Sequence, residues 1–171
     1  MMTRLITDRL MMRRATLADY DAYHALASDF DVVKWTGTWP WPAIASRTLE
    51  RCKPFDPQWG MAGPVFNKGQ MVGGMGIVSQ DVDGPKLGYM LTREAWGKGF
   101  ATEMACELIK HCWARYDWDQ IGAAVFQGNV ASRSVLQKLG FSKCGTATAF
   151  CQAQGTDLPV QKFALPRPPA K

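Results

Sequence analysis

Apolar residues recur with a helical period over residues 101–113 more clearly than anywhere else in the chain. Their offsets are 0, 3, 4, 7, 8, 11 and 12, the spacing of one helix face, and the residues are Ala101, Met104, Ala105, Leu108, Ile109, Cys112 and Trp113. A shorter stripe over residues 23–30 follows residues 16–19, which have the form of a capping box. Two more helices are expected over residues 43–52 and 129–139, the second with Asn129 as its N-cap.

Other segments have the apolar content and the flanking turn residues of β-strands. They are residues 9–13, 59–66, 71–78, 86–91, 120–126, 141–152 and 160–165. Gly69, in the short loop between the second and third segments, predicts a hairpin. Pro64 predicts an edge strand or a broken strand. The glycines within residues 73–76 predict a bulge or a close approach of another group to the backbone.

The order of these elements, β-α-α-β-β-β-α-β-α-β-β, predicts an α+β fold. We expect a mixed, mostly antiparallel twisted sheet of about seven strands flanked by about four helices. The length of 171 residues suits a single domain over residues 1–165. The proline-rich residues 166–171 predict an extended C-terminal tail.

The composition predicts a soluble cytoplasmic protein. Apolar residues make up 47% of the chain, but no segment approaches the ~18 uninterrupted apolar residues of a membrane-spanning helix. Residues 1–9 lack the apolar region of a signal peptide. The net charge of +5 comes without a basic run, which argues against nucleic acid as the main partner and favours an anionic cofactor or an acidic partner.

The cysteines and histidines show no metal-binding pattern. The five cysteines include no Cys-x-x-Cys pair, and the nearby Cys106, His111 and Cys112 fit no zinc template. Buried, reduced thiols are the expected state, and no metal is expected.

A glycine-rich turn joins the expected strand at residues 86–91 to the periodic helix. Residues 96–103 read Trp-Gly-Lys-Gly-Phe-Ala-Thr-Glu. Gly97 and Gly99 allow the backbone to approach a ligand closely. The helix that follows begins with unpaired N–H groups and the positive end of its dipole. This combination predicts an anion site, usually for phosphate.

Two common phosphate-binding motifs do not fit this turn. A P-loop requires glycine where Thr92 stands, and serine or threonine where Gly99 stands. A dinucleotide-binding loop requires a third glycine where Thr102 stands. The turn instead matches the end of the pyrophosphate loop of N-acetyltransferases, Gln/Arg-x-x-Gly-x-Gly/Ala, with Trp96 in the place of Gln or Arg.

Three motifs, in matching order, resemble the GNAT superfamily in its ribosomal-protein-acetyltransferase-like (RimJ/RimL) branch. Residues 96–103 resemble that branch's Trp-Gly-Lys-Gly-Tyr-Ala-Thr-Glu. Residues 129–141 resemble its Asn-x-x-Ser-x-x-Val-Leu-x-Lys-x-Gly-Phe, and residues 7–13 its opening, Thr-x-Arg-Leu-x-Leu-Arg. The resemblance covers residues 7–165 and implies a bacterial-type, acetyl-CoA-dependent N-acetyltransferase.

The resemblance also implies how the cofactor is held. In this family the strand before the loop and the strand after the long helix diverge, and the pantetheine arm of acetyl-CoA lies between them. Backbone groups of Met90 and Leu91 would pair with that arm, and backbone N–H groups of the loop would hold the pyrophosphate without a metal. The residues implied in binding are Met90, Leu91, Trp96, Gly97, Lys98, Gly99, Phe100, Ala101, Thr102, Asn129 and Ser132.

The implied reaction is direct attack of a neutral amine on the thioester in a ternary complex, with a backbone N–H near Leu91 facing the oxyanion. The thiolate that leaves, as CoA, needs a proton donor. Many family members have a tyrosine where this chain has Leu136, whereas in this branch a serine faces the thiol, here Ser132. Ser132 also suits a structural role in the first helical turn, and Ser134 is a weaker alternative donor.

The general base is less sharply indicated. Lys86 stands where related enzymes often have a glutamate. Glu103 matches the family motif, but it suits a role that complements the helix dipole at least as well. An α-amine with a pKa of about 7.7–8.0 is partly neutral without any base. The sequence therefore slightly favours an α-amine, or another weakly basic amine, over a lysine side chain.

No motif specifies the acceptor, which the sequence leaves as either a peptide N-terminus or a small-molecule amine. The aromatic residues 29–42, which include Trp35, Trp39 and Trp41, either line a substrate opening or cover the core. Leu136 and Lys86 also leave open a non-catalytic acyl-CoA-binding or sensor module on the same fold. The protein is expected to be a monomer or a homodimer.

Overall fold

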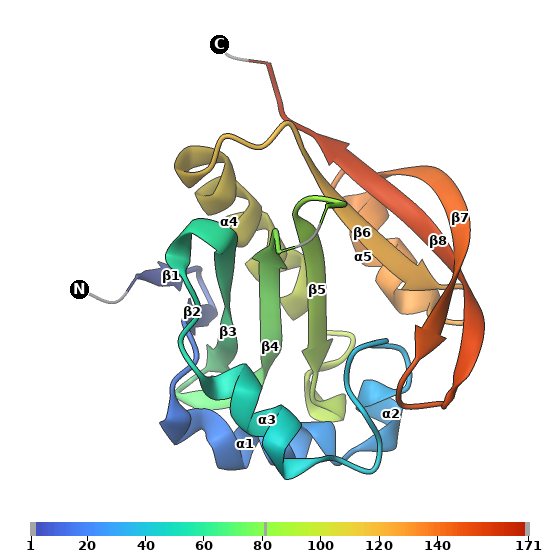
Figure 1. Ribbon diagram of the computed structural model, residues 1–171. Coiled ribbons are helices and arrows are strands. Elements are labelled where there is room, and N and C mark those ends of the chain that lie inside the picture. The colour runs from blue at the N-terminus through green and yellow to red at the C-terminus, as the bar shows by residue number, and fades with distance from the viewer. Residues whose placement is uncertain (1–2, 81, 170–171) are drawn as a thin grey trace.

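A single mixed sheet organises the computed structural model, which describes residues 3–80 and 82–169. Its eight strands follow the order β1-β2-β3-β4-β5-β6-β8-β7, and every neighbouring pair except β5 and β6 is antiparallel (Figure 1). The strands are β1 (Arg4–Ile6), β2 (Leu10–Arg13), β3 (Gly60–Asn67), β4 (Gln70–Val78), β5 (Lys86–Leu91), β6 (Gln120–Phe126), β7 (Ser142–Cys151) and β8 (Thr156–Pro166).

Helices cover both faces of this sheet. In Figure 1, α4 and α5 lie behind it, and α1 and α3 lie in front of its lower end. The α-helices are α1 (Tyr20–Ala27), α2 (Phe30–Val33), α3 (Ala45–Cys52), α4 (Phe100–Arg115) and α5 (Val130–Lys138). Short 3-10 turns lie at Leu17–Asp19, Pro57–Trp59 and Arg93–Ala95. No helix within the described residues is both long and apolar enough to cross a bilayer.

The predicted α+β class, with its mixed and mostly antiparallel sheet, is confirmed. Two elements exceed the expected number. Strand β1 pairs with β2 over only three residues, too few to show a period of two. Helix α2 is a single turn that begins after Asp29, whose carboxylate accepts the N–H of Asp31 at 3.1 Å. Elements this short are fixed by their neighbours rather than by their own pattern.

Pro64 lies in an inner strand of the sheet, at a point where that strand has only one paired neighbour. Strand β3 lies between β2 and β4, so the prediction of an edge strand is wrong. However, β2 pairs only with residues 65–67 of β3, and Pro64 lies just beyond that pairing. Its missing N–H therefore faces a stretch where β3 has one neighbour, which is where a sheet tolerates proline.

The periodic face of α4 packs into the main core as its spacing predicts. Met104, Ala105, Leu108 and Cys112 have no exposed surface. They belong to the same core cluster as buried residues of the sheet, including Met12, Met61 and Ile77. None of the five cysteines forms a disulfide. The long helix is therefore fixed against the sheet, and its N-terminus is held at the glycine-rich turn.

An ion pair joins the end of β2 to the start of α1. Arg13 donates to both carboxylate oxygens of Asp19, each at 2.8 Å, and the backbone N–H of Thr16 also donates to Asp19. Burial alone would raise the pKa of Asp19, but these hydrogen bonds and the charge of Arg13 together lower it. The ionised carboxylate therefore stabilises the fold, and the effect is present above the pKa of the carboxyl in the unfolded chain.

We expect Asp19→Asn to lower the free energy of unfolding by about 2–4 kcal/mol at pH 7, because Arg13 loses its partner in a largely buried site. The loss should be constant from pH 8 to 6 and should shrink below pH ~4, where the wild-type carboxyl gains protons. Urea unfolding across this range measures both effects. Asp21→Asn, at an exposed position in the first turn of α1, is the control. Equal stability of the two variants at pH 7 would contradict the role of the pair.

The chain beyond β8 is partly anchored, whereas the sequence predicts an extended tail from residue 166. Pro166 is the last residue of β8. The backbone N–H of Arg167 donates to Asp119, and its guanidinium donates to the carbonyls of Trp113, Tyr116 and Trp118. Residues 170–171 lie outside the described part of the chain.

Candidate active site

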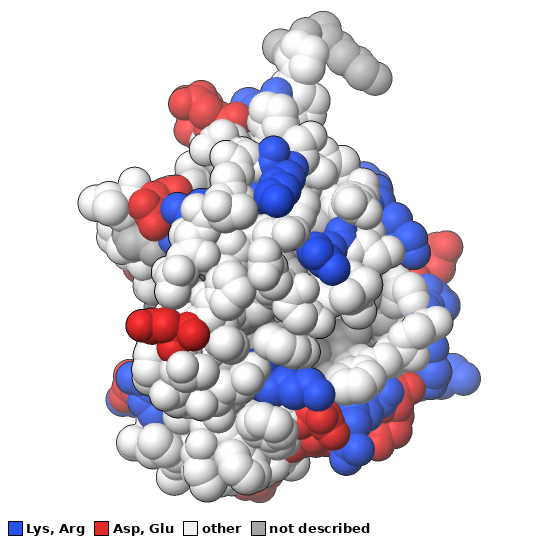
Figure 2. All heavy atoms as spheres, turned by 90° about the vertical axis from the view of Figure 1, so that its right-hand side faces the viewer, with Lys and Arg blue, Asp and Glu red and all other residues white. Residues whose placement is uncertain are grey.

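Strands β5 and β6 diverge, and this opens the sheet in its middle. The two parallel strands are in register only at Lys86 and Gly122. Beyond that point β6 pairs with β8 along its whole length. The side of the molecule that carries β7 and β8 is hollowed, with lysine and arginine side chains beside the hollow (Figure 2).

Backbone groups along β5 alternate between its two neighbours. The N–H of Thr92 donates to β4, and the carbonyl of Pro85 accepts from β6. By this alternation the backbone groups of Tyr89 and Leu91 face the opening, and those of Met90 face β4. The carbonyl of Leu91 accepts a hydrogen bond from the indole N–H of Trp96, in the glycine-rich turn, at 3.0 Å. The geometry therefore favours Tyr89 and Leu91 over the expected pair, Met90 and Leu91, as backbone partners for a ligand in the opening.

The glycine-rich turn delivers the N-terminus of α4 to this opening. Gly97 and Gly99 have φ values of +70° and +77°, a conformation that favours glycine. Gly99 is the N-cap of α4 and provides no capping side chain. The first N–H groups of a 16-residue helix therefore point toward the opening without a side-chain partner at the cap. Together with the helix dipole, these N–H groups provide an environment that favours an anion.

A cleft of about 600 Å³ lies between this turn, β5 and the start of α5. It brings together nearly all the residues for which the sequence predicts cofactor binding. The predicted residues that line it are Met90, Leu91, Trp96, Gly97, Gly99, Phe100, Ala101, Thr102, Asn129 and Ser132. Lys98 is exposed and is not among the residues that line the cleft.

A hydrogen-bonded pair of hydroxyl groups lies in the cleft. The hydroxyl oxygens of Tyr89 and Ser132 are 3.1 Å apart, and either one can donate. Asn129 caps α5, because its side-chain oxygen accepts the backbone N–H of Ser132 at 3.2 Å. The cap fixes the first turn of the helix, and the Ser132 side chain remains available to Tyr89. Burial raises the pKa of Tyr89, so this hydroxyl stays protonated at neutral pH.

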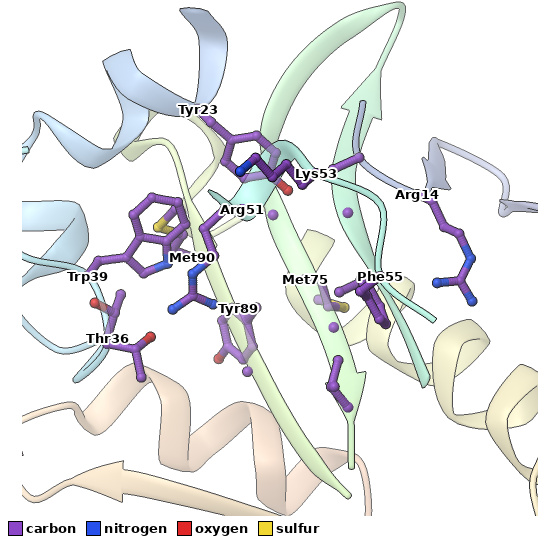
Figure 3. Close-up of a pocket in the computed structure, with 18 of the residues that line it drawn as sticks. Arg14, Tyr23, Thr36, Trp39, Arg51, Lys53, Phe55, Met75, Tyr89 and Met90 are labelled. Carbon is purple, nitrogen blue, oxygen red and sulfur yellow. The ribbon is translucent and has the colours of Figure 1, made fainter. Parts of the chain in front are cut away.

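A second cavity, of about 510 Å³, lies on the face of the sheet that α1 and α3 cover. Figure 3 shows Tyr23, Trp39 and Arg51 directed into it from separate segments, with Tyr89 at its edge toward α5. Thr36, Tyr89 and Met90 line this cavity and the first cleft alike. The two cavities therefore meet at Tyr89, where the sheet opens.

Comparison with known families identifies this architecture. A family model described as an acetyltransferase (GNAT) domain matches residues 9–142. The chain belongs to the GNAT acetyltransferase family.

Two relatives of this GNAT protein match nearly its whole length. It is 26% identical to the uncharacterized N-acetyltransferase YoaA of Bacillus subtilis, over 96% of this chain and 97% of the relative. It is 28% identical to the uncharacterized N-acetyltransferase p20 of Bacillus licheniformis, over 96% of each chain. With the family match, these relatives identify the protein as an N-acetyltransferase.

Solved structures share the fold. A ribosomal L7/L12 α-N-protein acetyltransferase, RimL, in complex with coenzyme A has a TM-score of 0.80 at 17% identity, covering 96% of this chain and 98% of that one. The microcin C7 self-immunity acetyltransferase MccE, in complex with acetyl-CoA and AMP, has a TM-score of 0.76 at 15% identity, covering 94% and 93%. The GNAT fold is therefore shown both by the family match and by structure.

Glu103, a candidate base in the sequence, is held by the N-terminal segment of this GNAT domain. Its carboxylate accepts the Thr7 hydroxyl at 2.6 Å and the backbone and side-chain N–H groups of Arg9. Burial would raise the pKa of Glu103, but these hydrogen bonds and the charge of Arg9 together lower it. Glu103 is not among the residues that line either cavity. This placement favours the structural role.

The three tryptophans of the aromatic segment lie in different surroundings. Trp39 is buried, stacks on Tyr23 with ring centroids 6.0 Å apart, and lines the second cavity. Trp35 lines the first cleft and packs closely on Gly128, where a Cβ atom would lie 2.2 Å from its ring. Trp41 is exposed and packs edge-on against Phe30.

Sequence reasoning did not identify Tyr89 or Arg51 as site residues. Tyr89 stands directly before the predicted backbone partner, so its position on an inner strand next to the glycine-rich turn was an available signal. Arg51 has no comparable signal, because it lies at the polar end of an amphipathic helix. The close approach predicted for the β4 glycines is present at Gly74, where a Cβ would lie 2.7 Å from the Tyr23 hydroxyl.

Proposed function

We propose that this N-acetyltransferase moves the acetyl group of acetyl-CoA to a primary amine in a ternary complex. The observation that carries the proposal is the meeting of two cavities at Tyr89. A cofactor in the first cleft and an amine in the second cavity would place thioester and nucleophile on either side of one opening. Both reactants can then be bound at once, as direct attack requires.

The first cleft suits coenzyme A because of its chemistry. The N–H groups at the start of α4 and in the turn at Gly97 and Gly99 would hold the pyrophosphate, without a metal. The backbone of Tyr89 and Leu91 would pair with the pantetheine arm. RimL and MccE, which share the fold, bind coenzyme A and acetyl-CoA respectively. Asn129, which caps α5, would lie beside the same arm.

In the proposed reaction the amine nitrogen attacks the thioester carbonyl carbon. A C–N bond forms, the C–S bond breaks, and the proton lost by the amine balances the proton gained by the CoA thiolate. The hydroxyl pair of Tyr89 and Ser132 would donate to the developing thiolate, and the N–H of Leu91 would face the oxyanion. The pair lies where the two cavities meet, which is the position that this role requires.

The second cavity lacks the usual kind of base. No aspartate or glutamate is among the described residues that line it. Basic residues within it would favour the neutral form of a bound amine, because a nearby positive charge lowers the pKa of an ammonium group. The amine would then lose its proton to water, as an α-amine with a pKa near 8 does readily.

Gly88→Val should block the amine while leaving the cofactor bound. Gly88 lines only the second cavity, and a Cβ at this position would meet no atom within 4 Å, so the side chain would project into open space. We expect the KM for the amine to rise at least about tenfold, because the valine occupies space that the substrate needs. The rise in melting temperature caused by acetyl-CoA should persist. Thiol release and acetylated product, measured over a panel of amines and peptide N-termini, provide the assay.

Gly145→Val is the matched control, since it is also a strand glycine whose Cβ would meet no atom within 4 Å, and it lines neither cavity. Unchanged amine kinetics in Gly88→Val would remove the second cavity from the proposal. Failure of the wild-type protein to acetylate any member of the panel, with acetyl-CoA bound, would overturn the transferase proposal for these acceptor classes.

A further inference from the structure

The charged residues that line the second cavity are all basic. Arg14, Arg51, Lys53 and Lys86 contribute to its wall, and no acidic residue does so among the described lining residues. Three of these four side chains form an ion pair or donate a hydrogen bond within the protein. Arg14 donates through Nη2 to the carbonyl of Gly60, although its buried Nη1 has no hydrogen-bond partner among the described residues. Lys53 pairs with Glu50, and Lys86 pairs with Asp83.

Arg51 differs from the other three. Within the described chain, no carboxylate pairs with its guanidinium and no acceptor receives a hydrogen bond from it. Its Cζ lies 5.1 Å from the centroid of the Trp39 ring. Figure 3 shows the guanidinium directed into the cavity, on the side of Thr36 and Tyr89. The contact with Trp39 orients the group, and its donors remain free.

The surroundings of the Arg51 guanidinium favour an anionic ligand. Arg51 is exposed, so solvent in the cavity reaches its side chain, and burial among the neighbouring atoms, and then the charge of Arg47, lower its pKa. A bound anion would offset both effects, since it would supply acceptors and an opposite charge. Guanidinium forks suit carboxylate and phosphate groups in particular.

The rest of the wall is largely apolar or aromatic. Tyr23, Trp39, Phe55, Met75 and Met90 line the same cavity as Arg51. The hydroxyl of Tyr23, on which burial acts to raise the pKa, makes no hydrogen bond to another described residue. A volume of about 510 Å³ is in the range of metabolite-sized ligands.

We propose that the acceptor is a small primary amine that carries a carboxylate or phosphate group, which Arg51 binds while the amine lies at Tyr89. This inference rests on the proposed transferase function and adds the class of substrate. Polyamines and other acceptors with extra positive charge are disfavoured, because the cavity offers them no counter-charge.

The test compares matched amines with the full-length protein and acetyl-CoA. The pairs are phenylalanine against phenylalaninamide, and phosphoethanolamine against ethanolamine; an alanyl tripeptide amide represents peptide N-termini. Rates are expressed per neutral amine. We expect kcat/KM to be at least about tenfold higher for an anionic member than for its neutral partner, since a hydrogen bond to a charged group is worth that much. The two pairs distinguish a carboxylate from a phosphate.

Arg51→Gln should remove that preference. The KM for the preferred anionic amine should rise about 10- to 100-fold, while the kinetics of its neutral partner change by less than about twofold. Arg51→Lys should recover part of the preference. Arg47→Gln is the control, because Arg47 lies on the same helix, pairs with Gln152 and lines neither cavity. The melting-temperature rise with acetyl-CoA confirms that each variant is folded.

Other results would overturn the inference. Equal rates for anionic and neutral partners, faster acetylation of the tripeptide amide, or a preference that survives Arg51→Gln would each exclude an anion site at Arg51 while leaving the transferase function intact. If no amine is acetylated, the transferase proposal fails separately. In that case 3-phenylpropionate should still raise the melting temperature of the wild type more than 3-phenylpropanamide does. Absence of that difference would overturn the anion site as well.

Discussion

Gly99→Val should abolish the rise in melting temperature that acetyl-CoA causes. At a concentration 100 times its Kd, a ligand that binds only the folded state stabilises it by about 2.7 kcal/mol. For a domain of this size, that corresponds to a rise of roughly 5–10 °C. Gly99 has φ of +77°, where a β-branched residue is strained by about 1–2 kcal/mol. Valine would therefore turn the backbone out of the conformation that presents the N–H groups at the start of α4.

The control for this variant is Gly69→Val, which separates strain from binding. Gly69 has φ of +80° in the β3–β4 hairpin, and a Cβ there would meet no atom within 4 Å. It should lower the melting temperature by a similar amount, but retain the full rise with acetyl-CoA. Differential scanning fluorimetry with and without acetyl-CoA measures both quantities. A Gly99→Val protein that responds to acetyl-CoA like the wild type would show that the turn does not hold the pyrophosphate.

The contrast between these two glycines shows what could be predicted from the sequence. The turn at Gly97 and Gly99, the periodic face of α4 and the N-cap at Asn129 each depend on residues close together in the chain. Local spacing was sufficient to predict all three, and the resemblance of residues 7–13, 96–103 and 129–141 to known motifs indicated the family. Strand β1 was not predicted, because its three residues are too few to show a hydrophobic pattern.

The second cavity could not be predicted in this way, because its wall is assembled from distant segments. Tyr23, Trp39, Arg51 and Tyr89 come from α1, a loop, α3 and β5. Glu103 was predicted as a candidate base from its position in a local motif. Its hydrogen-bond partners, Arg9 among them, lie more than 90 residues away in sequence and favour a structural role instead. For the second cavity and for Glu103 alike, the contacts join residues far apart in sequence, and a local hydrophobic pattern cannot predict such contacts.

Tyr89→Phe should lower kcat by about 100-fold with little change in the KM for acetyl-CoA. The substitution removes only the hydroxyl that is 3.1 Å from Ser132 and keeps the ring against the core. The pKa of Tyr89 is raised above its usual value of 10, whereas a thiol titrates near 8.5. Tyr89 would therefore keep its proton and stabilise the thiolate by donating a hydrogen bond. For the same reason, activity in the wild type should not decline between pH 8 and 9.5 through loss of this proton.

Ser132→Ala distinguishes a shared role from a single donor. If the hydroxyls act as a pair, Ser132→Ala and the double variant should each fall to about the level of Tyr89→Phe, because residues that act as a unit are not additive. Ser134→Ala, on the same helix and also lining the cleft, should retain nearly full kcat. Full activity in Tyr89→Phe with loss in Ser132→Ala would assign the donor to Ser132 alone. Full activity in both would exclude the pair from the reaction, and the thiolate would then be protonated by water in the opening between β5 and β6.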